Sequence, residues 1–379
     1  MGTIRSILDE IAKLRDGALL VIDYENKNRY CLVADEPDGT KTAYYFSAPI
    51  YNRQTRKMID LKFHRGDDGI YYVGSNVTVS FSNQIVMENK AGYCLISLKG
   101  PVSFVSDREL HWGKHRFYPT TNGLLLQAAC EDGKPFSFEL ELGTPFLGVR
   151  ANGKQVSLVK GVFPPFITMS CLGTGDEQGN IIAPAKITYQ KHSDRRYSLT
   201  VTPCSPAGKW MLLELNLYEE KLILDTTVES ADPKTNNAFG TAAFLGTTGE
   251  YGEQWLYSRP DFGRMTELMD KRILRVVAHL PKLDKGPVGV SAYEAAGRFC
   301  SFGSNWNNKA AVGNFISNGE VRGSYRDLDL TRLMADARTG NLLPFPGVVL
   351  KSQNDIGGFC AVSTGDSCFA PQIYEIHYQ

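Results

Sequence analysis

Along most of the chain, apolar and polar residues alternate with a period of two. The clearest segments are 77–81, 136–142 and 197–201, in which every second residue is valine, leucine, phenylalanine or tyrosine. This alternation gives a strand one buried face and one polar face, which is typical of antiparallel sheets. We therefore expect antiparallel strands to make up most of the protein.

Short turn sequences separate the alternating segments. Each pairs Asp or Asn with Gly, a combination that tolerates the positive φ angles of tight hairpins. Long helical crossovers, which parallel sheets need, have no counterpart in the pattern. The sequence therefore predicts an all-β fold whose turns include Asp38-Gly39, Asp68-Gly69, Asn122-Gly123, Asp132-Gly133, Asn152-Gly153 and Asn318-Gly319.

The first residues follow a different period. Ser6 is placed to cap a helix that ends near Gly17, and the apolar residues of this segment fall on one helical face, namely Ile4, Ile7, Leu8, Ile11 and Leu14. Residues 1–18 therefore predict one short amphipathic helix. Two roles stay open, because the helix can cover the open end of a β-domain or dock onto a partner or another copy.

The length of 379 residues exceeds what one ordinary core needs. Composition shifts divide the part after the helix into a first β-domain at 19–142, a second at 143–229 and a third at 230–379. We expect tandem antiparallel β-sandwiches. A helix at 329–340 is also predicted within the third domain, with Asp329 as its cap and Gly340 at its end.

Charge and apolar content exclude several classes of partner. The chain has 41 basic and 41 acidic residues, so no net field attracts nucleic acid or anionic lipid. The longest apolar run, 18–22, is too short to insert into a membrane. Asp9 and Glu10 interrupt any apolar segment of a signal peptide, so we expect no recognisable secretion signal.

Catalytic and metal-binding patterns are weak throughout. The sequence has no Gly-x-Ser-x-Gly elbow, and its eight cysteines are scattered without a C-x-x-C pair. Cys130 and Cys360 lie in apolar runs, where buried free thiols are the usual outcome. We expect no catalytic residue, cofactor or metal site, and no enzymatic activity.

The histidines and paired carboxylates also show no catalytic or metal-binding pattern. His111 and His115 are spaced to bind one metal ion only if they lie on a helix. The glycine between them favours a loop instead. His279 and His377 alternate with core residues and are predicted to face solvent. The same prediction applies to the carboxylate pairs Glu139/Glu141 and Asp327/Asp329.

One stretch is a candidate for ligand contact. Trp306 stands among Asn305, Asn307 and Asn308 in a Gly- and Ser-rich segment. Exposed rings with neighbouring amides are what a sugar-binding face needs. In the other interpretation, Trp306 anchors the loop to a sandwich while the asparagines bond their own backbone.

From about residue 160 onward, the order of several segments resembles the DNRLRE-domain family of bacterial surface proteins, including the β-region that precedes this domain in wall-associated and Rhs-type proteins. The resemblance implies a jelly-roll-like β-sandwich in the C-terminal part, and a non-catalytic module of adhesive or carbohydrate-associated surface proteins. The matching segments are LILDTTV (222–228), SADPKTN (230–236), KRILRVVAHLP (271–281), NWNNK (305–309), RDLDLTRL (326–333) and PQIYEIHY (371–378).

Two functional hypotheses follow. The first is an adhesive, carbohydrate-associated protein at the cell surface, outside the cell or on a virion, with a glycan or the cell envelope as its partner. The alternative is a structural component of a larger assembly, such as a phage appendage, an injection-system part or a self-assembling filament. We expect a homo-oligomer or larger assembly in either case, with no nucleic acid and no membrane insertion.

Overall fold

A computed structural model describes the chain in two compact units. It describes residues 6–53, 55–73, 77–80, 84–97, 99–130, 133–152, 154–155, 165–334, 346–353 and 358–379. Unit 1 comprises Asp60–Glu220 together with Phe239–Ala242. Unit 2 comprises Gly2–Ile59, Lys221–Ala238 and Ala243–Gln379.

Unit 1 is built from two sheets. Their strands pair antiparallel, apart from the parallel pair β14 and β16. The first sheet has the order β15 (Lys154–Gln155), β14 (Val149–Ala151), β16 (Ile167–Gly175), β20 (Trp210–Leu217), β12 (Gly123–Ala129), β11 (His115–Pro119), β10 (Glu109–Trp112), β9 (Val102–Ser106), with β17 (Ile181–Ala183) beside β16. The second has the order β18 (Ala185–Lys191), β19 (Arg196–Pro203), β13 (Phe136–Leu142), β8 (Gly92–Ser97), β7 (Gln84–Asn89), β6 (Val77–Ser80), β5 (Tyr71–Val73), β4 (His64–Arg65).

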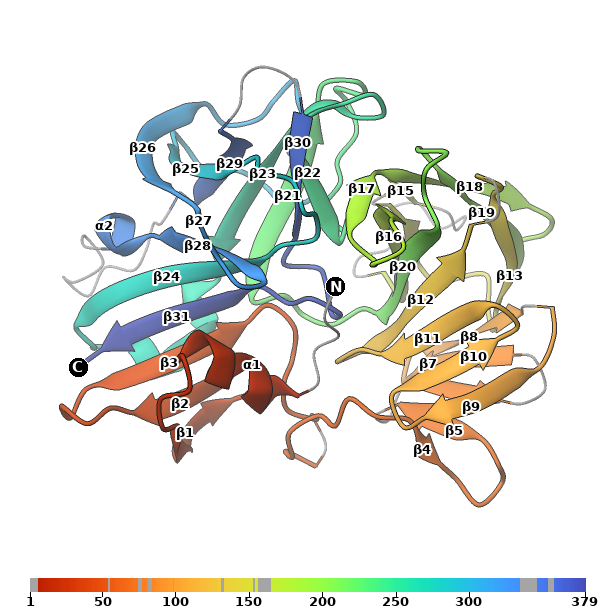
Figure 1. The fold of residues 1–379 in the computed structure, drawn as a ribbon, viewed down its shortest axis with the longest axis horizontal. Coiled ribbons are helices and arrows are strands. Elements are labelled where there is room, and N and C mark those ends of the chain that lie inside the picture. Colours follow the sequence, from red (N-terminus) through yellow and green to blue (C-terminus); the bar gives the residue numbers. More distant parts are fainter. Residues whose placement is uncertain are drawn as a thin grey trace. The chain divides into compact units, whose positions relative to one another are not determined.

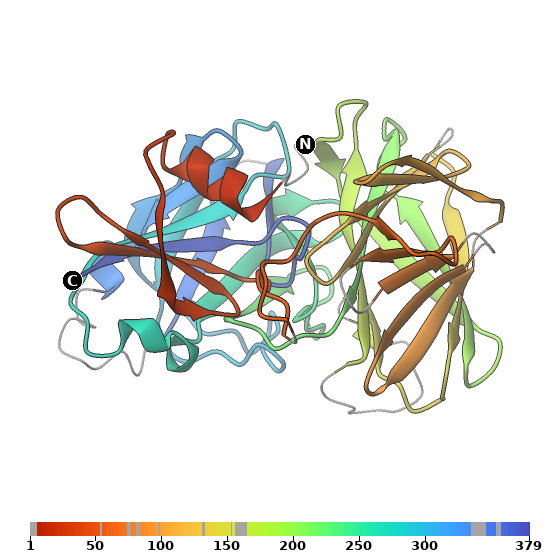
Figure 2. The ribbon, with the colours of Figure 1, turned by 90° about the horizontal axis from the view of Figure 1, so that it is seen from below.

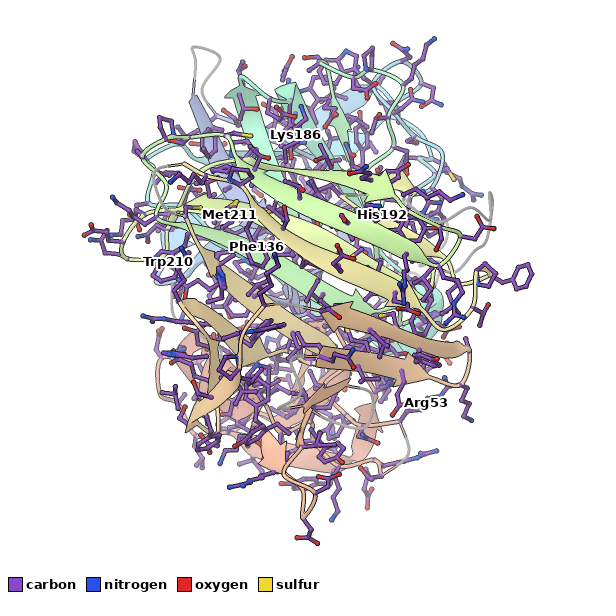
Figure 3. The ribbon with its side chains drawn as sticks, turned by 90° about the vertical axis from the view of Figure 1, so that its right-hand side faces the viewer. Arg53, Phe136, Lys186, His192, Trp210 and Met211 are labelled. Carbon is purple, nitrogen blue, oxygen red and sulfur yellow. The ribbon has the colours of Figure 1, made fainter. Side chains whose placement is uncertain are left out.

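The core of unit 1 follows from the alternation in the sequence. In β13, Phe138, Leu140 and Leu142 are buried while Glu139 is exposed, as the pattern predicts. Strand β19 pairs with β13 and buries Tyr197, Leu199 and Val201 on the same side. Figure 3 shows the sheet formed by β18, β19 and β13, with Lys186 and His192 labelled on it. The predicted strand at 77–81 is present as β6, and Phe81 lies outside the described residues.

Unit 2 joins the two ends of the chain in one sheet. Strand β31, the last of the chain, lies between β3 and β24 and pairs antiparallel with both. Figure 1 shows the red strands β2 and β3 beside the blue β31. The order of this sheet is β1 (Val21–Asn28), β2 (Cys31–Asp35), β3 (Lys41–Phe46), β31 (Ile373–Tyr378), β24 (Ile273–Pro281), β28 (Tyr325–Asp329), β27 (Glu320–Arg322).

A second sheet completes the sandwich of unit 2. Its order is β26 (Val312–Asn318), β25 (Val290–Ala295), β29 (Val348–Ser352), β23 (Gly252–Pro260), β22 (Ala242–Thr248), β30 (Gly358–Ser363), and β21 (Ile223–Glu229) also pairs with β23. Val33 and Ala278 of the first sheet share one buried core with Leu256 and Leu350 of the second. The all-β prediction, with antiparallel sandwiches and one short N-terminal helix, is confirmed.

Helix α1 (Ile7–Leu14) covers the outer face of the first sheet of unit 2 (Figure 2). The Ser6 side chain accepts a hydrogen bond from the Asp9 amide, so the predicted cap is confirmed. Ile7, Ile11 and Leu14 are buried against β2 and β3, whereas Leu8 is 38% exposed. The apolar face of the helix is therefore occupied by its own sheet. Ile4 lies outside the described residues.

The division into domains differs from the linear one expected. Residues 19–59 do not belong with 60–142, because β1, β2 and β3 pair with one another and with β31 near the C-terminus. Residues 143–229 do not form a separate sandwich either, because β16, β19 and β20 complete the two sheets of unit 1. The main part of unit 1, Asp60–Glu220, is thus inserted in the chain between β3 and β21 of unit 2, and the short segment Phe239–Ala242 joins unit 1 from beyond β21.

Several turn predictions are confirmed, including Asn122-Gly123, which lies in the hairpin connection between β11 and β12. Asn318-Gly319 connects β26 to β27, which belong to different sheets, so it does not form the tight hairpin that was expected. Gly39, Gly69, Gly133 and Asn152 have positive φ angles, but neither residue of Asn122-Gly123 or Asn318-Gly319 does. At Gly123 the reason for glycine is space, since a Cβ atom there would lie 2.0 Å from the Leu215 carbonyl oxygen of the paired strand.

The second predicted helix is present as α2 (Thr331–Met334), where Asp329 accepts a hydrogen bond from the Thr331 amide. Its continuation to Gly340 lies outside the described residues. Two short 3-10 helices, Phe262–Arg264 and Thr266–Leu268, follow β23. Cys130 and Cys360 are buried free thiols, as expected. No helix within the described ranges is both long and apolar enough to cross a membrane.

Candidate functional site

The segment between β25 and β26 contains Trp306 and packs on the outer face of the second sheet of unit 2. Trp306 and Ala310 contact a cluster that includes Tyr257 of β23 and Val349 of β29. The Tyr257 hydroxyl donates a hydrogen bond to the Ala310 carbonyl. The segment is therefore attached to the sandwich at two points, through an aromatic side chain and through its backbone.

A second tryptophan lies beside Trp306. The ring centroids of Trp255 and Trp306 are 5.1 Å apart with an interplanar angle of 54°. Lys309 places its ammonium group 3.7 Å from the Trp306 centroid and 4.9 Å from that of Trp255. Lys351 lies 4.4 Å from the Trp255 centroid. We call these residues, with Glu253, the tryptophan patch.

Hydrogen bonds fix the polar groups of the tryptophan patch. The Trp255 indole donates to the Glu253 carboxylate at 2.7 Å, and the Lys309 ammonium donates to the Trp306 carbonyl at 2.9 Å. Burial lowers the pKa of Lys309, Lys351 acts in the same direction, and Glu253 opposes them. Each ammonium near a ring gains a cation–π attraction of about 0.5–1 kcal/mol at an exposed site. The patch thus combines aromatic faces with two positive charges and one negative charge.

The three asparagines contribute mainly to the loop itself. The Asn305 side chain accepts hydrogen bonds from the amides of Asn307 and Asn308. The Asn308 side chain accepts from the Asn305 amide and donates to the Gly303 carbonyl. Of the four predicted contacts, Trp306 therefore lies in the patch, whereas Asn305 and Asn308 shape the loop that presents it. Asn307 is exposed beside them.

A second loop holds this segment in place. The Asn236 side chain donates hydrogen bonds to the carbonyls of Ser301 and Ser304, at 2.8 and 2.6 Å. The Asn307 amide donates to the Pro233 carbonyl at 3.2 Å. Two of the segments on which the family resemblance rests, 230–236 and 305–309, are thus neighbours in the fold.

Sequence reasoning missed Trp255, Lys351 and Glu253. Trp255 and Tyr257 lie on the same face of β23, and Leu256 pairs with Leu350 of β29. This register brings Lys351 beside Trp255. The alternation along β23 can be read from the sequence, but its pairing with β29 cannot. About 90 residues separate the two strands, and many other strands of the chain show a similar alternation.

The prediction that His279 faces solvent is wrong. Its side chain is 1% exposed, with Nδ1 2.7 Å from an Asp327 oxygen and Nε2 3.4 Å from a Glu375 oxygen. Burial opposes protonation, but these two carboxylates outweigh it and raise the pKa of His279. The Tyr325 ring packs edge-on at 6.0 Å, and its hydroxyl donates to Glu10 of α1.

The prediction that Asp327 and Asp329 both face solvent is therefore wrong for Asp327, whose carboxylate pairs with His279. It holds for Asp329, which is exposed. His377 is half-buried, and its ring nitrogen lies 2.5 Å from the Thr40 hydroxyl. One feature of the fold explains why these residues are less exposed than predicted. The outer face of this sheet carries helix α1, so alternate positions there are covered instead of wet.

The remaining candidates for chemistry do not converge. His111 bonds to Glu109, and His115 accepts a hydrogen bond from the Ala129 amide, so the two histidines of this hairpin have different partners. Within the described residues, no group of three or more His, Cys, Asp or Glu side chains is arranged to hold a metal ion.

No protein-family model matches this chain, and no curated protein matches its sequence. The resemblance to the DNRLRE-domain family therefore stays a prediction from the six segments. The class that the fold defines is a two-unit all-β protein of antiparallel sandwiches.

Proposed function

We propose that this protein is a non-catalytic adhesive protein of the cell surface or extracellular space, and that it binds carbohydrate through the tryptophan patch. The observation that supports the proposal is the pairing of two half-buried indole rings with Lys309 and Lys351 on the outer face of a sandwich sheet. The family resemblance, still a prediction, points to the same role.

The chemistry of the patch suits sugars. The C–H face of a pyranose packs on an indole ring, and aromatic residues supply large contact area at low conformational cost. The Glu253 carboxylate accepts hydrogen bonds, while Lys309 and Lys351 donate them. Two ammonium groups beside one ring favour a glycan that carries carboxylates or sulfates.

Backbone and side-chain hydrogen bonds hold the loop of Trp306 in one conformation through Asn236, Asn305 and Asn308. Such preorganisation reduces the entropy that binding would otherwise cost. Rigid anchoring and ligand contact are thus compatible roles for Trp306. The Trp306 ring packs against Trp255 and the sheet but is only partly buried.

A glycan array with neutral, uronic-acid-containing and sulfated oligosaccharides tests the proposal on the full chain. We expect binding to acidic glycans that is lost in Trp255→Ala. The matched control is Trp210→Ala, which removes another half-buried tryptophan with a cation at its ring, here Arg116 at 5.2 Å, from unit 1 (labelled in Figure 3). Folded protein that binds neither the array nor isolated cell envelopes would refute the proposal.

A further inference from the structure

Lys221 and Asp366 contact each other inside unit 2, at the connection between its last two strands, β30 and β31. Lys221 stands two residues before β21, and Asp366 lies between β30 and β31. The Lys221 ammonium nitrogen contacts a carboxylate oxygen of Asp366, and their side chains are only 16% and 4% exposed. The two reactive groups are therefore held in contact in an almost water-free interior.

A second carboxyl group adjoins this pair. Asp225 of β21 is 3% exposed and accepts a hydrogen bond from the amide of Gly365, the residue next to Asp366. Burial raises the pKa of Asp225 to about 7, and the nearby Lys221 opposes the shift. A protonated, buried carboxyl group beside an amine and a second carboxyl can pass protons between them.

The backbone around the pair is fixed. At Gly365 a Cβ atom would lie 2.8 Å from the Ile223 Cβ and 3.0 Å from the nearer Asp225 oxygen, so only glycine lets the loop approach β21 this closely. The Asp366 amide donates to the Thr364 hydroxyl, and the Ala370 amide donates to Ser367. Holding two reacting groups in place in this way supplies most of what an intramolecular condensation needs.

We propose that Lys221 and Asp366 form an intramolecular isopeptide bond, with Asp225 as the proton-transferring carboxyl group. The uncharged Lys221 amine attacks the carboxyl carbon of protonated Asp366, forming a C–N bond. Asp225 accepts the proton that the amine releases and donates its own proton to the departing hydroxyl. One C–O bond breaks and one water leaves, so the reaction is a condensation without redox change or co-reactant.

The surroundings favour the amide product. A charged pair that is removed from water bears a desolvation cost, and amide formation replaces two charges with one neutral group. Leu222 and Ile223, beside Lys221, belong to the sandwich core, which excludes water from the new bond. Exclusion of water also opposes hydrolysis, so the product is long-lived once formed.

The bond would tie the start of β21 to the connection between β30 and β31. Unit 2 would then be closed covalently, with β21 of one sheet linked to the connection that leads into β31 of the other. Such a cross-link resists unfolding when the chain is pulled, which suits an adhesive protein. The proposed bond does not depend on an adhesive function, however, because the argument for it uses only the side chains of Lys221, Asp225 and Asp366.

Intact-mass spectrometry of the purified full chain tests the proposal. We expect a mass below the calculated value by one water, and a tryptic digest in which the peptide around Lys221 is joined to that around Asp366. Lys221→Arg, which keeps the positive charge, and Asp225→Ala should both show the full calculated mass. The matched control is Lys41→Arg, which alters a lysine that also pairs with a half-buried carboxylate, Asp23, but should retain the loss of water.

A full calculated mass for the wild-type chain after prolonged incubation would overturn the proposal, whatever the variants do. Loss of water that persists in Lys221→Arg would place the condensation elsewhere and would also refute it. Loss that persists in Asp225→Ala would remove Asp225 from the reaction. None of these outcomes depends on glycan binding, so they are separate from the test of the proposed function.

Discussion

Replacing Ile11 with alanine should destabilise unit 2 substantially. Ile11 is fully buried between α1 and the sheet, where it belongs to one cluster with Leu32, Tyr44 and Phe46. Truncating a buried isoleucine to alanine costs about 2–5 kcal/mol, because transfer energy is lost and a cavity remains. With about 2–4 °C per kcal/mol for a domain of this size, a loss of about 3 kcal/mol lowers the melting temperature by about 6–12 °C.

Differential scanning calorimetry of the full chain measures this change. The matched control is Leu8→Ala on the same helix, where the side chain is 38% exposed and the expected change is within about 0.5 kcal/mol. Equal melting temperatures for the two variants would refute the packing of α1 on its own sheet. If Ile11→Ala instead abolished an oligomer without changing stability, the helix would be a docking element, as the alternative hypothesis of an assembly component requires.

Three further predictions concern buried groups. Arg326→Met leaves Asp284 buried without its partner and should cost about 3–5 kcal/mol, much of which the added change Asp284→Asn should restore in urea unfolding. The raised pKa of His279 means that its stabilisation is complete below its unfolded value of 6.5 and is lost as pH rises through the folded pKa. Wild-type stability should therefore decline from pH 6 to pH 8 more than that of His279→Asn, and parallel curves would contradict this. Gly123→Ala forces a Cβ atom within 2.0 Å of the Leu215 carbonyl oxygen and should destabilise unit 1, whereas Gly249→Ala, with no neighbour within 4 Å and no positive φ angle, serves as the control for a glycine without close contacts.

The alternation along single strands was enough to predict the fold class. In β13 and β19 the buried and exposed positions follow the sequence almost residue by residue. Strand partners were not predictable in the same way. The two-residue alternation shows which side chains of a strand share a face. It does not show that β3 pairs with β31 at the opposite end of the chain.

The errors at His279 and Asp327 share this origin. Polar residues at alternate positions indicate an outer face, and the rule assumes that an outer face is wet. Here α1 lies on that face and Tyr325 bonds to Glu10 of the helix, so the polar residues beneath it are buried and paired. The amphipathic helix was visible in the sequence, but which sheet it covers was not.

The candidate site was predicted in part. The isolated Trp306 among asparagines drew attention to one loop of the proposed site, and Asn305 and Asn308 bond their own loop backbone, as the anchoring interpretation expects. Trp255 and Lys351 come from two strands that the sequence does not place side by side. The proton-transferring role proposed for Asp225 was equally hidden, since it depends on burial and on a loop that arrives from the far end of the chain.

The most direct test of carbohydrate binding at the tryptophan patch is a fluorescence titration of the Trp210→Phe variant with a uronic-acid-containing oligosaccharide. Trp112 is fully buried, so the half-buried emitters in this variant are Trp255 and Trp306. We predict a saturable change in tryptophan emission that is absent when Trp255 is also replaced by phenylalanine. No change in emission at any glycan concentration, neutral or acidic, would contradict carbohydrate binding at the tryptophan patch.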